Sequence, residues 1–377
     1  MEKRPFKTAP MDVSLLGLGM MRLPKVSPDA DDIDYDKAQE IVDYAYSHGV
    51  NYFDTAYMYH GGKSEIFTGH ALKKYPRESF YLASKLPIWM ADTPADVERI
   101  FNDQLKKCQV EYFDFYLCHS QGAGNFKKLK EFGAYEFLRK MKEEGKIRYL
   151  GFSFHDKPVV LQEIVDTYEW DFAQIQLNYL DWTLYQSKEQ YEILEKAGIP
   201  AIIMEPVRGG FLANPGEEAV AKFKAARPDE SVASWAIRYA ATLPGVMTVL
   251  SGMSNMEQVM DNVKTMTDFE PVTEADQAVI DDVVENCLKK DFVPCTGCRY
   301  CMDCPFGVDI PKMFSIYNDY ALRKDAERFL KMYNETPESE RVHNCQQCGA
   351  CMAQCPQHIQ IPDQLAMIGE LVEKLSK

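Results

Sequence analysis

The chain has 377 residues, 46% of them hydrophobic, which is long enough for one large domain with a smaller module attached. Its 42 Lys and Arg against 57 Asp and Glu give a formal net charge of −15, which argues against a nucleic-acid partner. No stretch approaches the ~18 consecutive apolar residues that a membrane span needs. The first ten residues, MEKRPFKTAP, carry charges where a signal peptide needs an apolar run. We therefore expect a cytoplasmic protein with no membrane partner.

From residue 14 to about residue 290, short apolar, β-rich runs alternate with stretches whose apolar residues recur every three or four positions. The β-rich runs number eight and lie at residues 14–20, 50–56, 80–86, 113–119, 147–154, 172–179, 200–206 and 246–252. Helical periodicity is clearest at residues 35–49, 95–108, 135–145 and 232–245. Eight strand–helix units predict an α/β fold, a (β/α)8 TIM barrel over residues 1–290. No G-x-G-x-x-G follows the first run, so the main signature of an open dinucleotide-binding sheet is missing.

Polar residues stand where the second, third and fourth predicted strands end. Asp54 ends the second run, Lys85 the third and His119 the fourth, and Tyr59 follows Asp54 by five residues. The carboxyl ends of the strands form the active face of a TIM barrel, so we expect these four side chains to converge there.

Several segments carry a family resemblance: NYFDTAYMYHGGKSE, the Ser84-Lys85 step, CHS at 118–120, GKIRYLGFS at 145–153 and QLNYL at 176–180. Together they resemble the aldo-keto reductase family over nearly all of residues 12–265. The resemblance implies a catalytic tetrad of Asp54, Tyr59, Lys85 and His119.

The chemistry of such a tetrad follows from its residue types. Hydride addition to a carbonyl places negative charge on oxygen, so the site needs a proton donor, and a free tyrosine titrates at about 10. A lysine cation beside the phenol favours the phenolate and lowers its pKa. We assign Tyr59 as general acid, Lys85 as its activator, Asp54 as the anchor of Lys85 and His119 as the group that positions the carbonyl.

The resemblance also implies a nicotinamide cofactor, NADP or NAD. Polar contacts to it are expected from Ser153, Gln176, Glu205, Gly252, Ser254, Gln258 and Asn262. The family's usual Ser-Asn after the fifth strand reads Ser-Phe here, and its usual Tyr-Ser-Pro reads Met-Glu-Pro at residues 204–206. No basic residue lies within the SGMSN run at 251–255, so a choice of NADPH over NADH is a family expectation only.

Two further features concern the cofactor phosphates. A helix beginning near Asn255 would direct backbone N–H groups to them. The RGG turn allows close backbone approach at Gly209 and offers the cation of Arg208 to a pyrophosphate, the alternative being a plain turn with a solvated arginine.

Eight of the eleven cysteines lie in two tight runs near the C-terminus, each ending in Cys-Pro. They are Cys295, Cys298, Cys301 and Cys304, then Cys345, Cys348, Cys351 and Cys355. The spacing of the second run is typical of 4Fe-4S ligation, in which the fourth cysteine of a run binds the other cluster. The first run differs in having two residues rather than three between Cys301 and Cys304. We expect two 4Fe-4S clusters with crossed ligands, so that Cys355 joins the first three cysteines and Cys304 joins the second three. Structural zinc and disulfides are the alternatives.

The tail, residues 291–377, is predicted to be a mainly helical, ferredoxin-like module, with helical patterns at residues 308–333 and 359–377. It resembles the two-cluster ferredoxin domains of respiratory and heterodisulfide reductases, and the whole chain resembles the iron-sulfur subgroup of aldo-keto reductases. Cys108, Cys118 and Cys287 stand alone and are expected to be buried small hydrophobes.

The two halves together leave several functions open. We expect an NAD(P)H-dependent reductase of a small aldehyde or ketone. Clusters move single electrons and a nicotinamide moves a hydride, so one alternative is a flavin-using or cluster-coupled oxidoreductase that receives electrons from ferredoxin or another redox protein. Another is a non-enzymatic subunit that senses nicotinamide. The clusters could also be structural. Trp89, Tyr57, Trp182, Tyr179 and Phe154 are candidates to line an aromatic substrate cleft.

Overall fold

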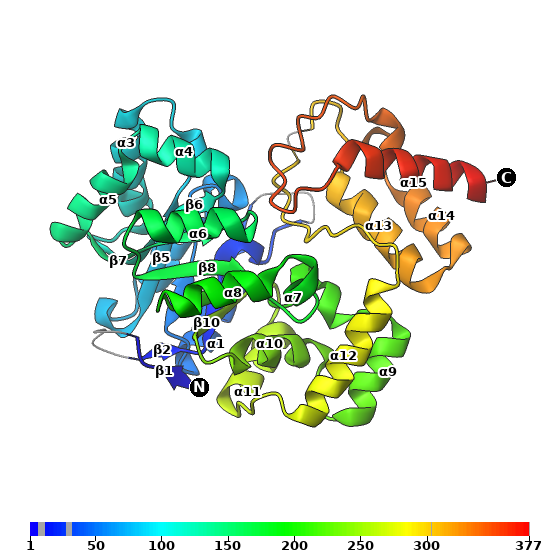
Figure 1. The fold of residues 1–377 in the computed structure, drawn as a ribbon, viewed down its shortest axis with the longest axis horizontal. Coiled ribbons are helices and arrows are strands. Elements are labelled where there is room, and N and C mark those ends of the chain that lie inside the picture. Colours follow the sequence, from blue (N-terminus) through cyan, green and yellow to red (C-terminus); the bar gives the residue numbers. More distant parts are fainter. Residues whose placement is uncertain (7–11, 28–31, 303, 377) are drawn as a thin grey trace. The chain divides into compact units, whose positions relative to one another are not determined.

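The computed structural model describes residues 1–6, 12–27, 32–302 and 304–376, so part of the charged segment MEKRPFKTAP lies outside the described residues. Their contacts define two compact units (Figure 1). The first contains residues 1–206 and 234–272, and the second contains residues 207–233 and 273–377. Each unit is described by itself below.

The first unit is built on a closed barrel of eight parallel strands. Each strand pairs with the next one along the chain, and β10 closes the ring by pairing with both β9 and β3. Every predicted run contains one strand, so the TIM barrel predicted from the sequence is confirmed. The strands are β3 (Leu16–Gly19), β4 (Tyr52–Asp54), β5 (Tyr81–Leu86), β6 (Phe113–Gln121), β7 (Ile147–Phe154), β8 (Phe172–Gln176), β9 (Ala201–Met204) and β10 (Val246–Ser251).

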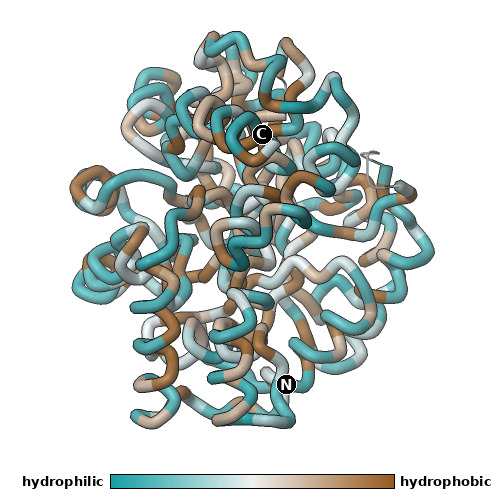
Figure 2. The backbone as a smooth tube through the Cα atoms, turned by 90° about the vertical axis from the view of Figure 1, so that its right-hand side faces the viewer, coloured by the Kyte–Doolittle hydropathy of each residue, from teal (hydrophilic) through white to brown (hydrophobic). Residues whose placement is uncertain are grey.

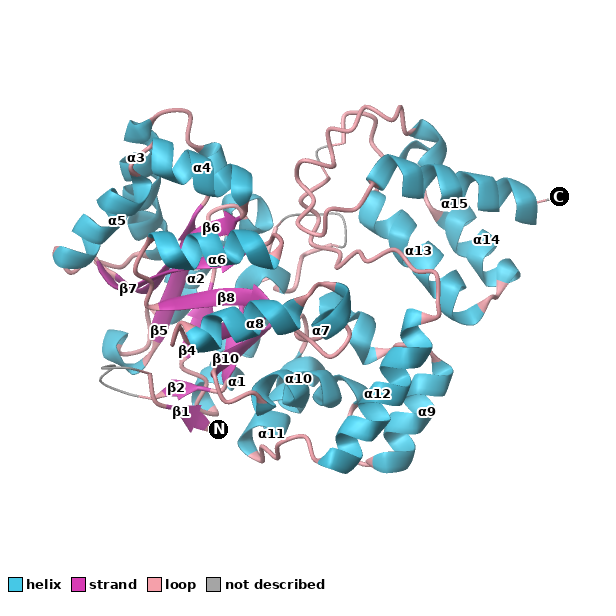
Figure 3. Cartoon of the chain, in the orientation of Figure 1, coloured by secondary structure: helices cyan, strands magenta, loops and turns pink. Residues whose placement is uncertain are grey.

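Helices surround these strands (Figure 3), and hydrophobic residues, coloured brown, are interspersed with hydrophilic residues, coloured teal, along the backbone (Figure 2). No helix in the described parts of the chain is long and apolar enough to cross a membrane. The helices of this unit are α1 (Tyr35–Ser47), α2 (Ser64–Leu72), α3 (Pro94–Cys108), α4 (Ala123–Glu131), α5 (Ala134–Glu143), α6 (Pro158–Thr167), α7 (Asp181–Leu184), α8 (Ser187–Lys196), most of α10 (Val232–Thr242) and α11 (Met256–Thr267).

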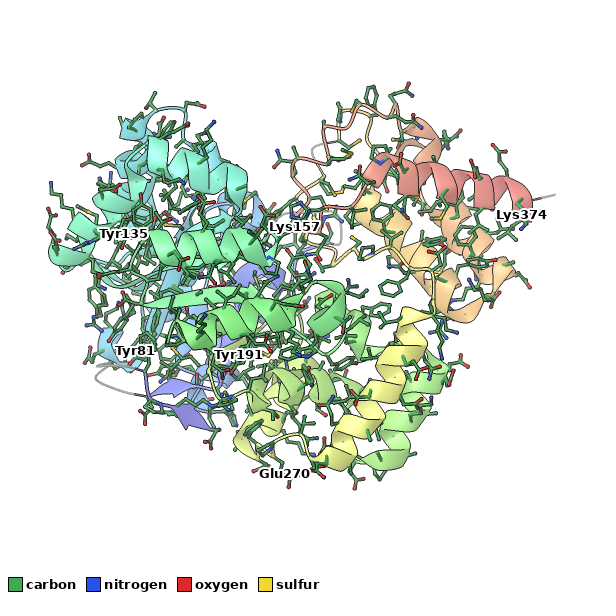
Figure 4. The ribbon with its side chains drawn as sticks, viewed as in Figure 1. Tyr81, Tyr135, Lys157, Tyr191, Glu270 and Lys374 are labelled. Carbon is green, nitrogen blue, oxygen red and sulfur yellow. The ribbon has the colours of Figure 1, made fainter. Side chains whose placement is uncertain are left out.

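The barrel interior is aromatic toward the amino ends of the strands. Phe115 stands at the centre of this layer, with ring centroids 5.0 Å from Tyr52, 5.5 Å from Tyr81 and 5.1 Å from Phe172. Tyr81, labelled in Figure 4, begins β5. Phe6, which follows the short strand β1 (Lys3–Arg4), packs on Phe115 at 5.3 Å, while β1 pairs with β2 (Val13–Ser14). Apolar side chains thus fill this end of the barrel and leave the opposite end to polar groups.

The second unit is mainly helical apart from the cysteine-bearing loops (Figure 3). It contains α9 (Glu217–Ala226), α12 (Glu274–Leu288), α13 (Ile310–Arg323), α14 (Ala326–Glu335) and α15 (Ile361–Leu375). Helices α13 to α15 confirm the helical patterns predicted at residues 308–333 and 359–377. The apolar faces of α13 to α15 form one core, which includes Met313, Phe314, Phe329 and Leu365. Six of the eight cysteines, three from each run, belong to this core or pack against it.

Candidate active site

Strand alternation brings three of the four predicted catalytic residues to the inner face of the barrel. Side chains along a strand alternate between its two faces. Asp54 lies two residues beyond the interior Tyr52, Lys85 lies two beyond the interior Ala83, and His119 lies two beyond the interior Leu117. All three therefore continue the inward row into the polar carboxyl end of the barrel.

Lys85 and Asp54 form a buried ion pair. The Lys85 Nζ atom donates to Asp54 Oδ1 at 2.6 Å and to the backbone oxygen of Thr55 at 2.8 Å. Lys85 is 0% exposed and Asp54 is 3% exposed. Burial lowers the pKa of Lys85 and raises the pKa of Asp54, because each charge loses its hydration, while their mutual attraction offsets part of both effects. The ammonium is therefore held at one place by a charged partner and a carbonyl.

Tyr59 and His119 complete the group. Tyr59 begins the 3₁₀ turn η2 (Tyr59–Gly62), and the Lys85 Nζ atom lies 5.0 Å from the centroid of its ring. The ring centroids of Tyr59 and His119 are 6.1 Å apart with their planes nearly perpendicular. Trp89 also packs on His119, with ring centroids 5.0 Å apart. The structure thus brings all four predicted residues together.

His119 is held as a neutral imidazole. It is 3% exposed, and burial lowers its pKa well below the usual value, with the charges of Lys85 and His155 acting in the same direction. Its buried Nδ1 atom has no hydrogen-bond partner within the described residues. A neutral imidazole offers one N–H donor, which suits a group that contacts a carbonyl oxygen.

A buried polar network lies behind Lys85, on the outer face of the barrel. Glu65 Oε1, on α2, accepts hydrogen bonds from Ser84 Oγ and from Gln104 Nε2, both at 2.6 Å. Gln104, on α3, also donates to the backbone oxygen of Lys85 at 3.0 Å. Burial raises the pKa of Glu65, which is 0% exposed. This network connects two helices to β5 at the residue that carries the ammonium.

The residues after the eighth strand that were predicted to contact a cofactor lie around Arg22, which was not among the predicted site residues. Arg22 ends the 3₁₀ turn η1 (Met20–Arg22), and its backbone oxygen accepts from Ser254 Oγ at 2.7 Å. A Cβ atom placed on Gly252 would lie 3.0 Å from the Arg22 Cβ atom, so the missing side chain leaves room for the arginine. Helix α11 begins beside it, capped by Asn255, whose side chain accepts from the backbone N–H of Gln258. The predicted helix start near Asn255 is confirmed.

Glu205 pairs with this arginine. Arg22 Nη2 donates to Glu205 Oε1 at 3.2 Å, and both side chains are partly exposed. Glu205 follows β9 with a φ of 54°, a left-handed conformation that is costly for a residue other than glycine and concentrates at functional positions. The only sequence signal for Arg22 is its place just beyond the first strand, at the end of the barrel where the tetrad gathers.

The remaining predicted cofactor contacts are engaged with the barrel itself. Ser153 Oγ accepts from the backbone N–H of Ser120 at 2.7 Å. Gln176 Nε2 donates to Asp181 Oδ2 at 2.8 Å, and Asn262 Nδ2 donates to Ser251 Oγ at 2.8 Å. These bonds fix the side chains at the strand ends.

Arg208 and Gly209 lie in the second unit, within the turn η5 (Arg208–Ala213). Arg208 is 2% exposed, so the alternative of a solvated arginine is wrong. Its guanidinium lies over the ring of Phe292, 5.5 Å from the centroid.

The cysteines fall into two sets that combine the two runs. One cavity is lined by Cys295, Cys298, Cys301 and Cys355, together with apolar residues of α13 and α15 that include Phe314 and Ile361. Burial raises the pKa of Cys301, and the thiols of Cys298, Cys295 and Cys355 raise it further.

In the second set, burial likewise raises the pKa of Cys351, and its thiol neighbours are Cys345, Cys304 and Cys348. These are the two sets expected for crossed ligation. Within the described ranges, no three His, Cys, Asp or Glu side chains are spaced for a single metal ion. Iron and sulfide stand between the thiolates of a cubane, so a cluster needs its ligands further apart.

The five candidate cleft aromatics have different surroundings. Trp89 contacts His119, as described above. Tyr179 and Trp182 pack against Tyr239, with centroids 6.0 and 6.1 Å away, and Phe154 is completely buried. Tyr57 packs against Lys107 of α3.

Comparison with protein families agrees with both parts of this structure. Residues 15–285 match the Aldo/keto reductase family, and residues 294–360 match the 4Fe-4S dicluster domain. The first match covers well over half of the chain. The protein therefore belongs to the aldo/keto reductase family of oxidoreductases and carries an iron-sulfur domain at its C-terminal end.

The alignments with curated relatives extend over most of the length of each relative. An uncharacterized oxidoreductase, YqkF, of Bacillus subtilis is 27% identical over 294 residues, which cover 70% of this chain and 90% of that protein. L-galactose dehydrogenase of Arabidopsis thaliana is 26% identical over 75% of this chain and 93% of its own. The NADH-specific methylglyoxal reductase of Escherichia coli is 26% identical over 71% and 94%.

Among solved structures, the holo form of aldo-keto reductase AKR11C1 from Bacillus halodurans is 28% identical, with a TM-score of 0.61, over 75% of this chain and 96% of its own. An aldo-keto reductase from Klebsiella pneumoniae in complex with NADPH has a TM-score of 0.59 over 75% and 96%, and at 21% identity it shows the common fold alone.

Proposed function

We propose that the barrel reduces a small aldehyde or ketone with NAD(P)H, with Tyr59 as the proton donor. The observation that carries this proposal is the tetrad: an ammonium 2.6 Å from a carboxylate, 5.0 Å from the centroid of a phenol ring, with a neutral histidine beside that phenol. The nicotinamide would supply a hydride to the carbonyl carbon. The carbonyl oxygen then needs a proton and hydrogen bonds, which this group of side chains provides.

Each side chain has a distinct role. The Tyr59 hydroxyl gives its proton to the carbonyl oxygen, and the Lys85 cation stabilises the phenolate that remains. Asp54 and the Thr55 oxygen hold the ammonium in place, so it does not reorient when charge develops. The N–H of neutral His119 orients the carbonyl oxygen. Trp89, packed on His119, bounds the space where the substrate carbonyl lies.

The cofactor phosphates are proposed to lie at the start of α11, near Gly252, Ser254 and Gln258. Arg22 supplies the cation there, while Glu205, Ser153, Gln176 and Asn262 shape the surroundings. Since Arg22 lies beside the eighth-strand segment, it can attract either the pyrophosphate shared by NADH and NADPH or the additional phosphate of NADPH. The similar proteins include an NADH-specific methylglyoxal reductase and an aldo-keto reductase whose structure contains NADPH.

For the tail, residues 291–377, we propose two 4Fe-4S clusters. The first is held by Cys295, Cys298, Cys301 and Cys355, and the second by Cys345, Cys348, Cys351 and Cys304. The two thiol groupings described above support this assignment. Each cluster exchanges single electrons, for which a ferredoxin or another redox protein is the proposed partner. We place the enzyme in the cytoplasm, where thiols stay reduced.

The test of the reductase function compares the anaerobically purified 377-residue chain with its Tyr59→Phe variant. The assay follows NADPH or NADH oxidation over a panel of aliphatic, aromatic and 2-oxo aldehydes. The wild type should turn over at least one of them, and Tyr59→Phe should lose 10²-fold or more, roughly the contribution of one general acid. Cofactor binding, followed by nicotinamide fluorescence, should persist in the variant.

Tyr44→Phe on α1 is the matched control, because it removes a hydroxyl from a ring that stacks on His48 and has no part in the proposed site. It should keep wild-type turnover. Comparable turnover by Tyr59→Phe would contradict the assigned role. Flavin released in stoichiometric amount from the wild type, together with failure to oxidise either nicotinamide, would instead favour the flavin-using alternative.

A further inference from the structure

The turn that begins at Arg208 has an unusual backbone. Arg208, Gly209 and Gly210 all have positive φ values, 50°, 64° and 95°. Two glycines adopt this region without cost, but an arginine does so only where its surroundings hold it there. The Arg208 side chain is also 2% exposed, which is unusual for an arginine. The turn therefore carries a cation that is shielded from solvent.

The turn rests on the segment that carries the first cysteine. The Arg208 guanidinium lies over the Phe292 ring, and the Phe211 ring stacks on the same ring with centroids 5.3 Å apart. A Cβ atom on Gly209 would lie only 2.0 Å from the backbone oxygen of Thr296. Thr296 directly follows Cys295 and lines the cavity shared by the first set of cysteines. Contacts of Arg208, Gly209 and Phe211 thus hold the turn against residues 292–296.

We propose that Arg208 sets the reduction potential of the cluster held by Cys295, Cys298, Cys301 and Cys355. This inference rests on the cluster ligation proposed above. Four thiolates give a 4Fe-4S cluster a net negative charge, and net charge is one of the quantities that fix its potential.

The redox step involves one electron. The oxidised cluster accepts it from a low-potential one-electron carrier, for which dithionite stands in during a titration. No bond breaks and no proton is needed, and the negative charge of the cluster rises by one. A fixed cation in a poorly solvated site stabilises the more negative form more, so Arg208 raises the potential of this cluster.

The experiment is an anaerobic redox titration of the 377-residue chain with both clusters, followed by electron paramagnetic resonance. Arg208→Gln removes the charge and keeps a polar side chain of similar shape. The matched control is Arg328→Gln on α14, an exposed arginine paired with Asp319 at 2.8 Å. Cys298→Ser, which alters one ligand, identifies the signal of the first cluster.

We expect Arg208→Gln to lower the midpoint potential of the first cluster and to leave the second unchanged. Arg328→Gln should leave both at their wild-type values. An unchanged first cluster in Arg208→Gln with full iron content, or an equal fall of both clusters, would overturn the inference. A wild type without 4Fe-4S signals would instead refute the proposed ligation.

Gly209→Ala provides a second readout that does not depend on Arg208→Gln holding its iron. The new Cβ atom would collide with the backbone oxygen of Thr296, so the turn at Arg208–Gly210 must move away from the segment that contains Thr296. We expect a lower potential for the first cluster, or loss of iron from that cluster alone. Wild-type iron content and potentials in Gly209→Ala would contradict the placement of the turn.

Discussion

At the scale of single residues, the buried ion pair of Lys85 and Asp54 decides what the barrel can do. Neither side chain would be stable as a lone charge at this depth, since burial disfavours both ionised forms. The pair is therefore a precondition for a cation beside Tyr59. In the proposed reductase the pair holds this cation, and removal of either partner leaves the other buried without its counter-charge.

Lys85→Met should remove carbonyl reduction and destabilise the barrel by about 3–5 kcal/mol, because Asp54 is left buried without its partner. Asp54→Asn combined with Lys85→Met should recover a large part of that stability, since no charge then remains, but none of the activity. Urea unfolding followed by tryptophan fluorescence measures both. Equal stability of the single and double variants would show that the unpaired charge of Asp54 is not the cause of the destabilisation.

Arg22→Gln tests the proposed phosphate contact. A hydrogen bond to a charged group contributes about 1.5–3 kcal/mol, so the dissociation constant of the preferred nicotinamide should rise roughly 10- to 100-fold. Arg139→Gln on α5 is the control, because that arginine is 52% exposed and pairs only with its neighbour Glu143 among the contacts described. If NADPH weakens and NADH does not, Arg22 contacts the additional phosphate. Unchanged affinity for both would remove Arg22 from the site.

At the scale of elements, helices α2 and α3 position the residues behind Lys85. Glu65 comes from α2 and Gln104 from α3, and both bond at Ser84 or at the Lys85 backbone. The two helices approach so closely that a Cβ atom on Gly69 of α2 would lie 2.6 Å from the Cys108 backbone of α3. A small residue at this crossing is what allows the network to close.

Gly69→Ala should therefore destabilise the protein by about 1–3 kcal/mol, because backbone must move to admit the methyl group. Gly124→Ala on α4 is the matched control, with no atom within 4 Å of its added Cβ. There the change should stabilise by roughly 0.5–1 kcal/mol, the usual gain when alanine replaces glycine in a helix. Thermal unfolding of the two variants separates the effects, and a loss of the same size in both would rule out the close crossing.

At the scale of the whole molecule, we expect the folded state of the iron-sulfur domain to depend on bound iron more than the folded state of the barrel does. Cysteines of both runs pack against the core formed by α13, α14 and α15, whereas the barrel has its own aromatic core around Phe115. Metal binding contributes folding free energy directly when the ligands of a small domain are otherwise held only by loops.

Removing the iron with a chelator under oxygen should accordingly raise hydrogen exchange in α13 and α15 and leave β4, β5 and β6 protected. Hydrogen exchange with mass spectrometry measures both regions in one sample. Protein kept anaerobic without chelator is the control. Equal deprotection of the strands and the helices would show that the two parts unfold together.

The sequence by itself predicted the eight strands, the family, the four catalytic candidates and the two cysteine runs. These features are local: the strands follow from periodicity along the chain and the cluster ligands from the cysteine runs, whereas the family and its catalytic candidates follow from short motifs that resemble those of aldo-keto reductases. The start of α11 was also predictable, because Asn255 is a good capping residue directly before a helical pattern.

Tertiary structure decided the contacts between residues distant in the chain. Arg22 and Glu205 meet because β10 closes the barrel between β3 and β9, and no local pattern records that closure. The same holds for Arg208, for which the sequence predicted a cation facing a cofactor pyrophosphate, with a solvated turn as the alternative. Its burial against Phe292 depends on a segment more than eighty positions later in the chain, and only the folded arrangement determines which side of a turn meets another part of the protein.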